Sequence, residues 1–91
     1  MNSVSPVLMR DNEIISLKEA AFRSGKNEKT VRRWCVSDGI GRRPSPTAPW
    51  EISALALEAK RYGDAAAIDD LRRGDFATLR VRRYAEHLGL D

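Results

Sequence analysis

The clearest pattern of apolar and polar positions lies in residues 16–36, where two short helical periods meet at Gly25. In the first period, Leu17, Ala20 and Ala21 fall on one helical face. Glycine suits the left-handed conformation at a helix end, because it has no Cβ to clash with the preceding turn. The pattern therefore predicts two helices joined by a tight corner.

The residues at the expected starts of both helices are of the kind that cap a helix. Ser16 followed three residues later by Glu19 predicts a capping box, in which both side chains accept hydrogen bonds from N–H groups of the first turn. Asn27 is predicted to cap the second helix in the same way. These caps place both helix starts without reference to the rest of the chain.

The second helix has an apolar side, with Val31, Trp34 and Cys35, and a polar side that is mainly basic. That polar side carries Glu28, Lys29, Arg32 and Arg33. Small Ala21 lets two helices approach, and Gly25 four residues later supplies the turn between them. This spacing predicts a helix-turn-helix unit, whose second helix enters the DNA major groove. A plain helical hairpin with a solvated basic face is the alternative.

A small β-hairpin is predicted after the second helix. Residues 40–43 are expected to form a short strand, and Trp50-Glu51-Ile52 alternates like a half-buried strand. Three prolines lie between residues 44 and 49, and proline cannot donate a backbone hydrogen bond within a helix or a central strand. Residues 40–52 are therefore expected to form a wing, a hairpin with a stiff tip. An irregular connector is the alternative. Trp50, like Trp34, occupies an apolar register and is expected in the core.

Three further helices are expected beyond the hairpin. Ser53 is predicted to cap a helix over 54–62, a second helix covers 65–73, and a third covers 76–88. His87, near the end of the last helix, is expected to be a plain surface residue. The last helix has an apolar stripe made of Ala77, Val81, Tyr84 and Leu88.

The organisation that these patterns predict has three parts. Residues 1–12 carry no period and form a loose leader, with 7–9 touching the domain and 13–15 extended. Residues 13–62 form a winged helix-turn-helix domain, and 63–91 form a helical extension for interaction or oligomerisation. The fold class is mainly α with a small β-hairpin wing.

Charge is distributed unevenly along the chain. The formal net charge is +3, but residues 26–43 alone carry +4, and residues 44–75 carry −2. A basic patch of this kind is the electrostatic footprint expected of a nucleic-acid binder.

Candidate catalytic and metal-binding groups are sparse. One cysteine and one histidine cannot make a four-ligand metal site, and no phosphate-binding glycine loop is present. Cys35 is expected to be a small core hydrophobe, and Asp69 and Asp70 diverge on their helix. We therefore expect no enzyme activity, no cofactor and no small-molecule ligand. With no signal peptide and no apolar run of about 18 residues, a cytoplasmic, nucleoid-associated protein is expected.

The segments LKEAA at 17–21 and TVRRW at 30–34, with the hairpin and Trp50-x-Ile52, resemble the winged-helix domains of phage and mobile-element excisionases and of MerR-type regulators. The resemblance covers about residues 14–62. The wing here is rich in proline and lacks a glycine at its tip, and the chain has no room for the long dimerisation helix of MerR-type regulators.

The resemblance implies that the second helix reads the major groove and that the wing touches the adjacent backbone or minor groove. It implies groove or phosphate contacts by Lys29, Thr30, Arg32 and Arg33, and wing contacts by Arg42 and Arg43. Lys26 and Asn27, at the start of the second helix, complete the expected DNA-binding set. An arginine fork matches guanine O6 and N7, and neighbouring arginines clamp phosphates.

Three functions are compatible with these features. The first is an architectural excisionase-type protein that binds repeated DNA sites and directs a partner recombinase, with double-stranded DNA, the recombinase and its own copies as partners. The second is a transcriptional regulator that dimerises through 76–88. The third is a protein-interaction adaptor, either like the small subunit of a phage terminase or a helical adaptor that does not bind DNA, in which the last helix is the working surface.

Overall fold

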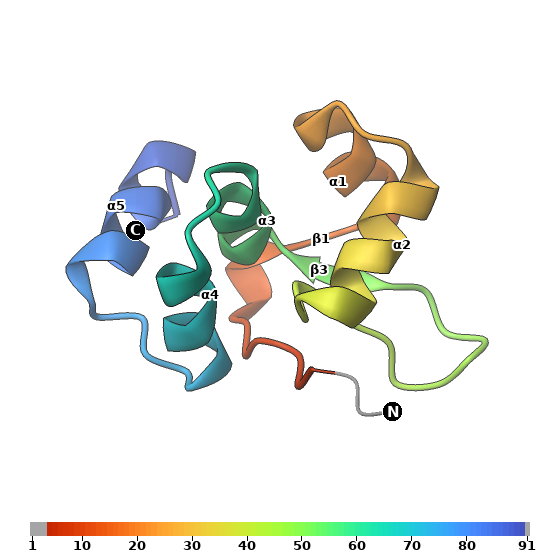
Figure 1. Cartoon of the computed structure of the whole chain (residues 1–91), viewed down its shortest axis with the longest axis horizontal. Helices are drawn as coiled ribbons and strands as arrows, with labels where there is room; N and C mark the ends of the chain where they lie inside the picture. The colour runs from red at the N-terminus through yellow and green to blue at the C-terminus, as the bar shows by residue number, and fades with distance from the viewer. Residues whose placement is uncertain (1–3, 91) are drawn as a thin grey trace.

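Five α-helices pack around a small antiparallel sheet in residues 4–90, the part of the chain that this computed structural model describes (Figure 1). The elements in chain order are a 3-10 turn at Asp11–Glu13, β1 (Ile14–Ile15), α1 (Leu17–Ser24), α2 (Glu28–Ser37), β2 (Gly41–Arg42), β3 (Glu51–Ser53), α3 (Ala54–Arg61), α4 (Ala65–Arg72) and α5 (Leu79–Leu88). The predicted fold class is confirmed at this level, a mainly helical chain with a small β-sheet.

The corner between α1 and α2 forms where the sequence predicts it. Ser16 Oγ accepts the Glu19 N–H at 3.0 Å, and Gly25 adopts the left-handed conformation with φ 69°. Asn27 Oδ1 accepts the Thr30 N–H at 2.8 Å. The second half of the predicted capping box is not formed, because the Glu19 carboxylate accepts instead from Arg23 one turn later, at 2.8 Å.

The three strands form one sheet with β3 in the centre. β2 and β3 make the predicted antiparallel hairpin, with Gly41 opposite Ile52. β1, the extended segment expected before α1, pairs with the other edge of β3, with Ile15 also opposite Ile52. The proline-rich loop between β2 and β3 projects away from the body beside α2 (Figure 1). The sheet thus ties the hairpin to the segment that leads into α1.

α3 is the central helix of the molecule. Leu55, Leu57 and Ala59 are at most 1% exposed, and α1, α4 and α5 all pack against this helix. α4 and α5 lie on the side of α3 away from α2 and the hairpin loop (Figure 1). The molecule therefore has one end made of α1, α2 and the hairpin and another made of α4 and α5.

The last helix starts three residues later than predicted. Thr78 Oγ1 accepts the Val81 N–H and caps α5, so Phe76 and Ala77 precede the helix. Ala77 is exposed, whereas Val81 and Tyr84 are buried. A serine or threonine that competes for backbone N–H groups ends a helical pattern that apolar spacing alone would extend.

The N-terminal segment contacts the domain at residues 7–9, as predicted, and is bound to it more closely than a loose leader would be. Val7 is 1% exposed, its N–H donates to the Gly39 carbonyl at 2.8 Å, and the Leu8 N–H donates to the Leu71 carbonyl at 3.0 Å. A Cβ on Gly39 would lie 2.5 Å from the Ser5 carbonyl oxygen. The N-terminal segment can therefore pack this closely against Gly39 only because glycine has no side chain. Residues 4–12 therefore join the two ends of the molecule, and positions 1–3 lie outside the described residues.

Two buried carboxylates hold elements together, and sequence patterns do not reveal either of them. Glu13 and Asp70 are both 0% exposed. Glu13 accepts from Ser53 Oγ at 2.6 Å, which links the 3-10 turn to the cap of α3. Asp70 accepts from Arg80 and from Thr78, which links α4 to α5. Buried charges of this kind persist only when hydrogen bonds satisfy them.

Candidate nucleic-acid interface

The outer face of α2 carries the predicted basic side chains. Val31 and Cys35 are 0% and 3% exposed, so they hold the inner face of the helix against the core. Lys29, Arg32 and Arg33 are all exposed on the opposite side. The apolar residues of α2 thus fix its rotation, and the basic side chains point away from the protein.

Few acidic side chains of the described chain neutralise this face. Arg32 Nη1 lies 3.9 Å from Glu28 Oε1, and both side chains are about half exposed. Such a pair contributes roughly 0.3–0.5 kcal/mol at best, so it does not hold Arg32 back from a ligand. Lys29 and Arg33 have no carboxylate within 4.0 Å among residues 4–90. Lys29 and Arg33 are therefore free of internal ion pairs, and Arg32 is held only weakly, so all three are available to an anionic ligand.

The start of α2 contributes two exposed residues and one partly exposed residue. Lys26 and Asn27 are exposed at the corner, and Thr30 is partly exposed one turn further along. The side-chain oxygen of Asn27 is already used by the Thr30 N–H. Of the two roles considered for Asn27, phosphate contact or helix capping, the structure shows the capping role.

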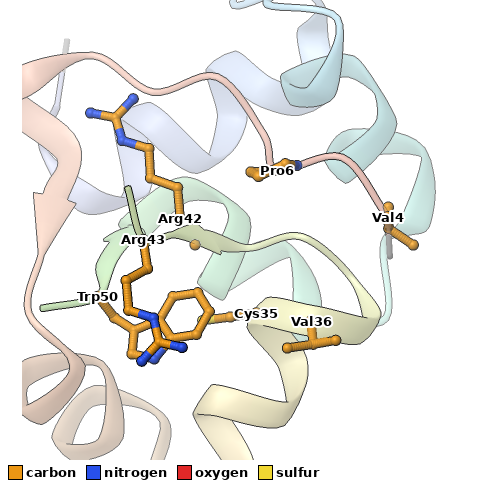
Figure 2. Close-up of a pocket in the computed structure, with 8 residues that line it drawn as sticks. Val4, Pro6, Cys35, Val36, Arg42, Arg43 and Trp50 are labelled. Atoms are coloured by element: carbon orange, nitrogen blue, oxygen red, sulfur yellow. The ribbon is translucent and has the colours of Figure 1, made fainter. Parts of the chain in front are cut away.

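The two arginines of the hairpin have different surroundings. Arg42 Nε donates to Glu51 Oε1 across the strands at 2.8 Å. The Arg43 guanidinium carbon lies 4.7 Å from the centre of the Trp50 ring, and Arg43 has no carboxylate within 4.0 Å in the described residues. Figure 2 shows Arg43 beside Trp50 and Arg42 pointing away from both. The hairpin thus offers one cation free of an ion pair where the sequence predicts two.

Trp50 also holds a polar atom without a partner. Its indole Nε1 is buried and donates to no acceptor among the described residues. A buried donor left without an acceptor costs about 1–3 kcal/mol. The sequence predicts both tryptophans in the core; each is only partly buried, although each packs against it. The Lys60 ammonium lies 5.5 Å from the centre of the Trp34 ring.

A pocket of about 170 Å³ opens between α2 and the hairpin (Figure 2). Arg43, Trp50 and Val36 lie along it together with Pro6 of the N-terminal segment. Cys35 also borders it, and burial raises the pKa of this thiol to about 12. The thiol therefore stays protonated at neutral pH and packs as the small hydrophobe that the sequence predicts.

Several charged residues at the far end of the molecule make internal contacts, although Arg82 and Arg83 on α5 are exposed and form no ion pair within residues 4–90. Glu58, 6% exposed, accepts from Arg61 at 2.8 Å and lies 3.1 Å from His87 Nε2. His87 is exposed, as the sequence predicts, but its contact with the buried Glu58 is a feature that only the structure reveals. Burial, followed by a hydrogen bond to Asp64, raises the pKa of Tyr84 to about 12. These contacts link α3, α4 and α5 to one another.

Within residues 4–90, no three acidic, histidine or cysteine side chains gather closely enough to hold a metal ion. The longest helices in the same range have ten residues, and none is long and apolar enough to cross a membrane. Comparison of the chain with protein-family models, with curated proteins and with solved structures finds no match. Function is therefore inferred from the geometry of the α2 face and the hairpin.

Proposed function

We propose that the protein is a winged helix-turn-helix DNA-binding protein that places α2 in the major groove and the β2–β3 hairpin on the adjacent backbone. The observation that supports this most directly is the row of exposed cations on α2, which faces away from the core and is almost free of internal ion pairs. Arg43 of the hairpin adds a cation beside the same helix. One arginine of the pair Arg32 and Arg33 reads a base edge, and its neighbour binds phosphate.

The number of free cations sets the expected strength of binding. Phosphate contacts by Lys26, Lys29, Arg43 and one of the two arginines of α2 make four. Four such contacts give a log–log salt slope of about −3.6, so affinity falls roughly 100-fold between 50 and 200 mM salt. One such module binds DNA weakly at physiological salt. We therefore propose an architectural role in which several copies occupy adjacent sites and direct a partner recombinase.

The packing of α5 supports this role over the dimeric regulator. Val81, Tyr84 and Ala85 are at most 8% exposed, because they face α3 and α4. Val81 and Tyr84, two residues of the predicted dimer stripe, are thereby occupied within one chain, whereas Ala77 is exposed and Leu88 is partly exposed. Head-to-tail copies predict direct repeats in a footprint, whereas a symmetric dimer predicts two inverted half-sites about 34–36 Å apart.

The test is the salt dependence of binding to a random 20-base-pair duplex, measured by fluorescence anisotropy. R32A/R33A should weaken binding and make the slope shallower by about one unit for each phosphate that these arginines neutralise in the wild type. R82A/R83A on α5 is the matched control, because Arg82 and Arg83 are also adjacent, exposed and outside any ion pair in the described residues.

The control variant loses the same charge and should leave the slope unchanged. Equal slopes for the two double variants would show that only net charge matters, which contradicts the assignment of α2 to the groove. A wild-type protein that does not bind duplex DNA would overturn the proposal entirely.

A further inference from the structure

The pocket between α2 and the hairpin combines an apolar side with a cation and an unsatisfied N–H. Val36 is 51% exposed although it lies on the helix that carries the basic face. Pro6 lies across the opening from it (Figure 2). Arg43 and the Trp50 indole supply the polar side. An anion with an apolar part next to it would match both sides.

The size of the pocket limits what it binds. Pockets for free small molecules typically enclose about 300–1,000 Å³, and this one encloses about 170 Å³. A ligand held only here would make few contacts. A repeating polymer that is bound elsewhere on the same surface needs only one of its units to enter. The basic face of α2 supplies that other contact, because Val36 of the same helix lines the pocket.

Arg43 is able to rearrange when such a unit arrives. Its guanidinium lies over the Trp50 ring, and it makes no ion pair with any described carboxylate. Movement of the guanidinium toward an incoming anion breaks no salt bridge and frees the face of the ring that carries the buried Nε1. The indole N–H then gains the acceptor that it lacks in the free protein.

We propose that this pocket binds one sugar–phosphate unit of duplex DNA, with Arg43 and the Trp50 Nε1–H on the phosphate and Val36 against the deoxyribose. The inference rests on the proposed function and adds to it a residue that the sequence assigns to the core. It also predicts different roles for Arg43 and Trp50. Arg43 contributes both charge and a hydrogen bond to phosphate binding, whereas the Trp50 indole contributes a hydrogen bond alone.

The first experiment separates these two contributions through the salt slope. W50F keeps an aromatic ring and removes the N–H, so affinity for the 20-base-pair duplex should fall about tenfold with no change in slope. R43A should weaken binding and make the slope shallower by about one unit. W34F applies the same chemical change to the other tryptophan and should leave affinity and slope as in the wild type.

The second experiment uses fluorescence. The chain has two tryptophans, so W34F leaves Trp50 as the single emitter. The Trp50 emission should change on titration with the duplex. The midpoint of that change should equal the midpoint of the anisotropy titration. Inorganic phosphate at matched ionic strength should not reproduce the change, which separates a duplex backbone from free phosphate.

The possible outcomes are distinct. If the wild type binds the duplex but W50F binds as tightly as W34F, the pocket assignment fails and the proposed function stands. A shallower slope in W50F together with a lower melting temperature would mean that Trp50 only supports the hairpin, which also overturns the inference. If the Trp50 emission of W34F stays constant while the duplex binds, the pocket assignment is also overturned. Absence of duplex binding by the wild type removes the proposed function and this inference together.

Discussion

The hairpin packs tightly against α2 at Gly41, and a single methyl group there tests how closely the two are packed. A Cβ at this position would lie 2.8 Å from Cys35 Sγ, 2.9 Å from Ile52 Cγ1 and 3.0 Å from the Glu51 carbonyl oxygen. The backbone of Gly41 does not have a positive φ. The cost of Gly41→Ala therefore comes from crowding, and not from backbone strain.

The expected loss of stability is large for this chain. Overpacking a core by one methyl group costs about 1–3 kcal/mol. A domain of 91 residues has a total unfolding free energy of about 5–14 kcal/mol. A loss of about 2 kcal/mol would lower the melting temperature by about 8–16 °C. The neighbours of the new methyl group include a central strand and a buried side chain, which places the cost in the upper half of the range.

A double-mutant cycle with Cys35→Ala isolates the sulfur contact. Cys35→Ala alone should destabilise by about 1 kcal/mol, because it removes one buried heavy atom. The double variant should be more stable than the sum of the single effects by about 0.5–1.5 kcal/mol, since the shorter side chain gives space to the new methyl group. Urea unfolding measures all four free energies.

Two results would contradict close packing at Gly41. If Gly41→Ala leaves the unfolding free energy unchanged, or if the two substitutions add within about 0.3 kcal/mol, the hairpin does not press on α2 as described. Gly63→Ala is a useful comparison, because its Cβ would meet nothing within 4 Å and its cost comes from φ 69° alone. That cost should be about 1 kcal/mol and should not change in the Cys35→Ala background.

Two buried carboxylates give the remaining predictions. The hydrogen bond from Arg80 holds the pKa of Asp70 below its usual value, so its stabilisation is present above about pH 4 and is lost as the pH falls through the lowered pKa. Asp70→Asn should therefore lower the melting temperature at pH 7, and the gap from the wild type should narrow in strong acid; an equal gap at both pH values would contradict the ion-pair account. Ser53→Ala removes the hydroxyl that donates to Glu13 and accepts the Ala56 N–H, and should cost about 1–3 kcal/mol in urea unfolding. A loss below about 0.5 kcal/mol would mean that water replaces the hydroxyl.

The sequence alone determined the local structure of the helix corner. Ser16, Gly25 and Asn27 act through atoms within three or four residues of themselves, so their roles could be predicted before any tertiary contact was known. The division of α2 into an apolar and a basic face also follows from helical spacing alone. These short-range rules placed the row of cations on α2 correctly.

Contacts between distant parts of the chain decided the rest. The burial of Val7 depends on Gly39, which lies 32 positions later, and the role of Arg42 depends on Glu51 across the hairpin. The unpaired indole donor of Trp50 likewise emerges only when the hairpin folds beside α2. Periodicity reports which side of an element is buried, but it carries no information about which distant group will meet it, because that pairing is settled by how all the elements pack together.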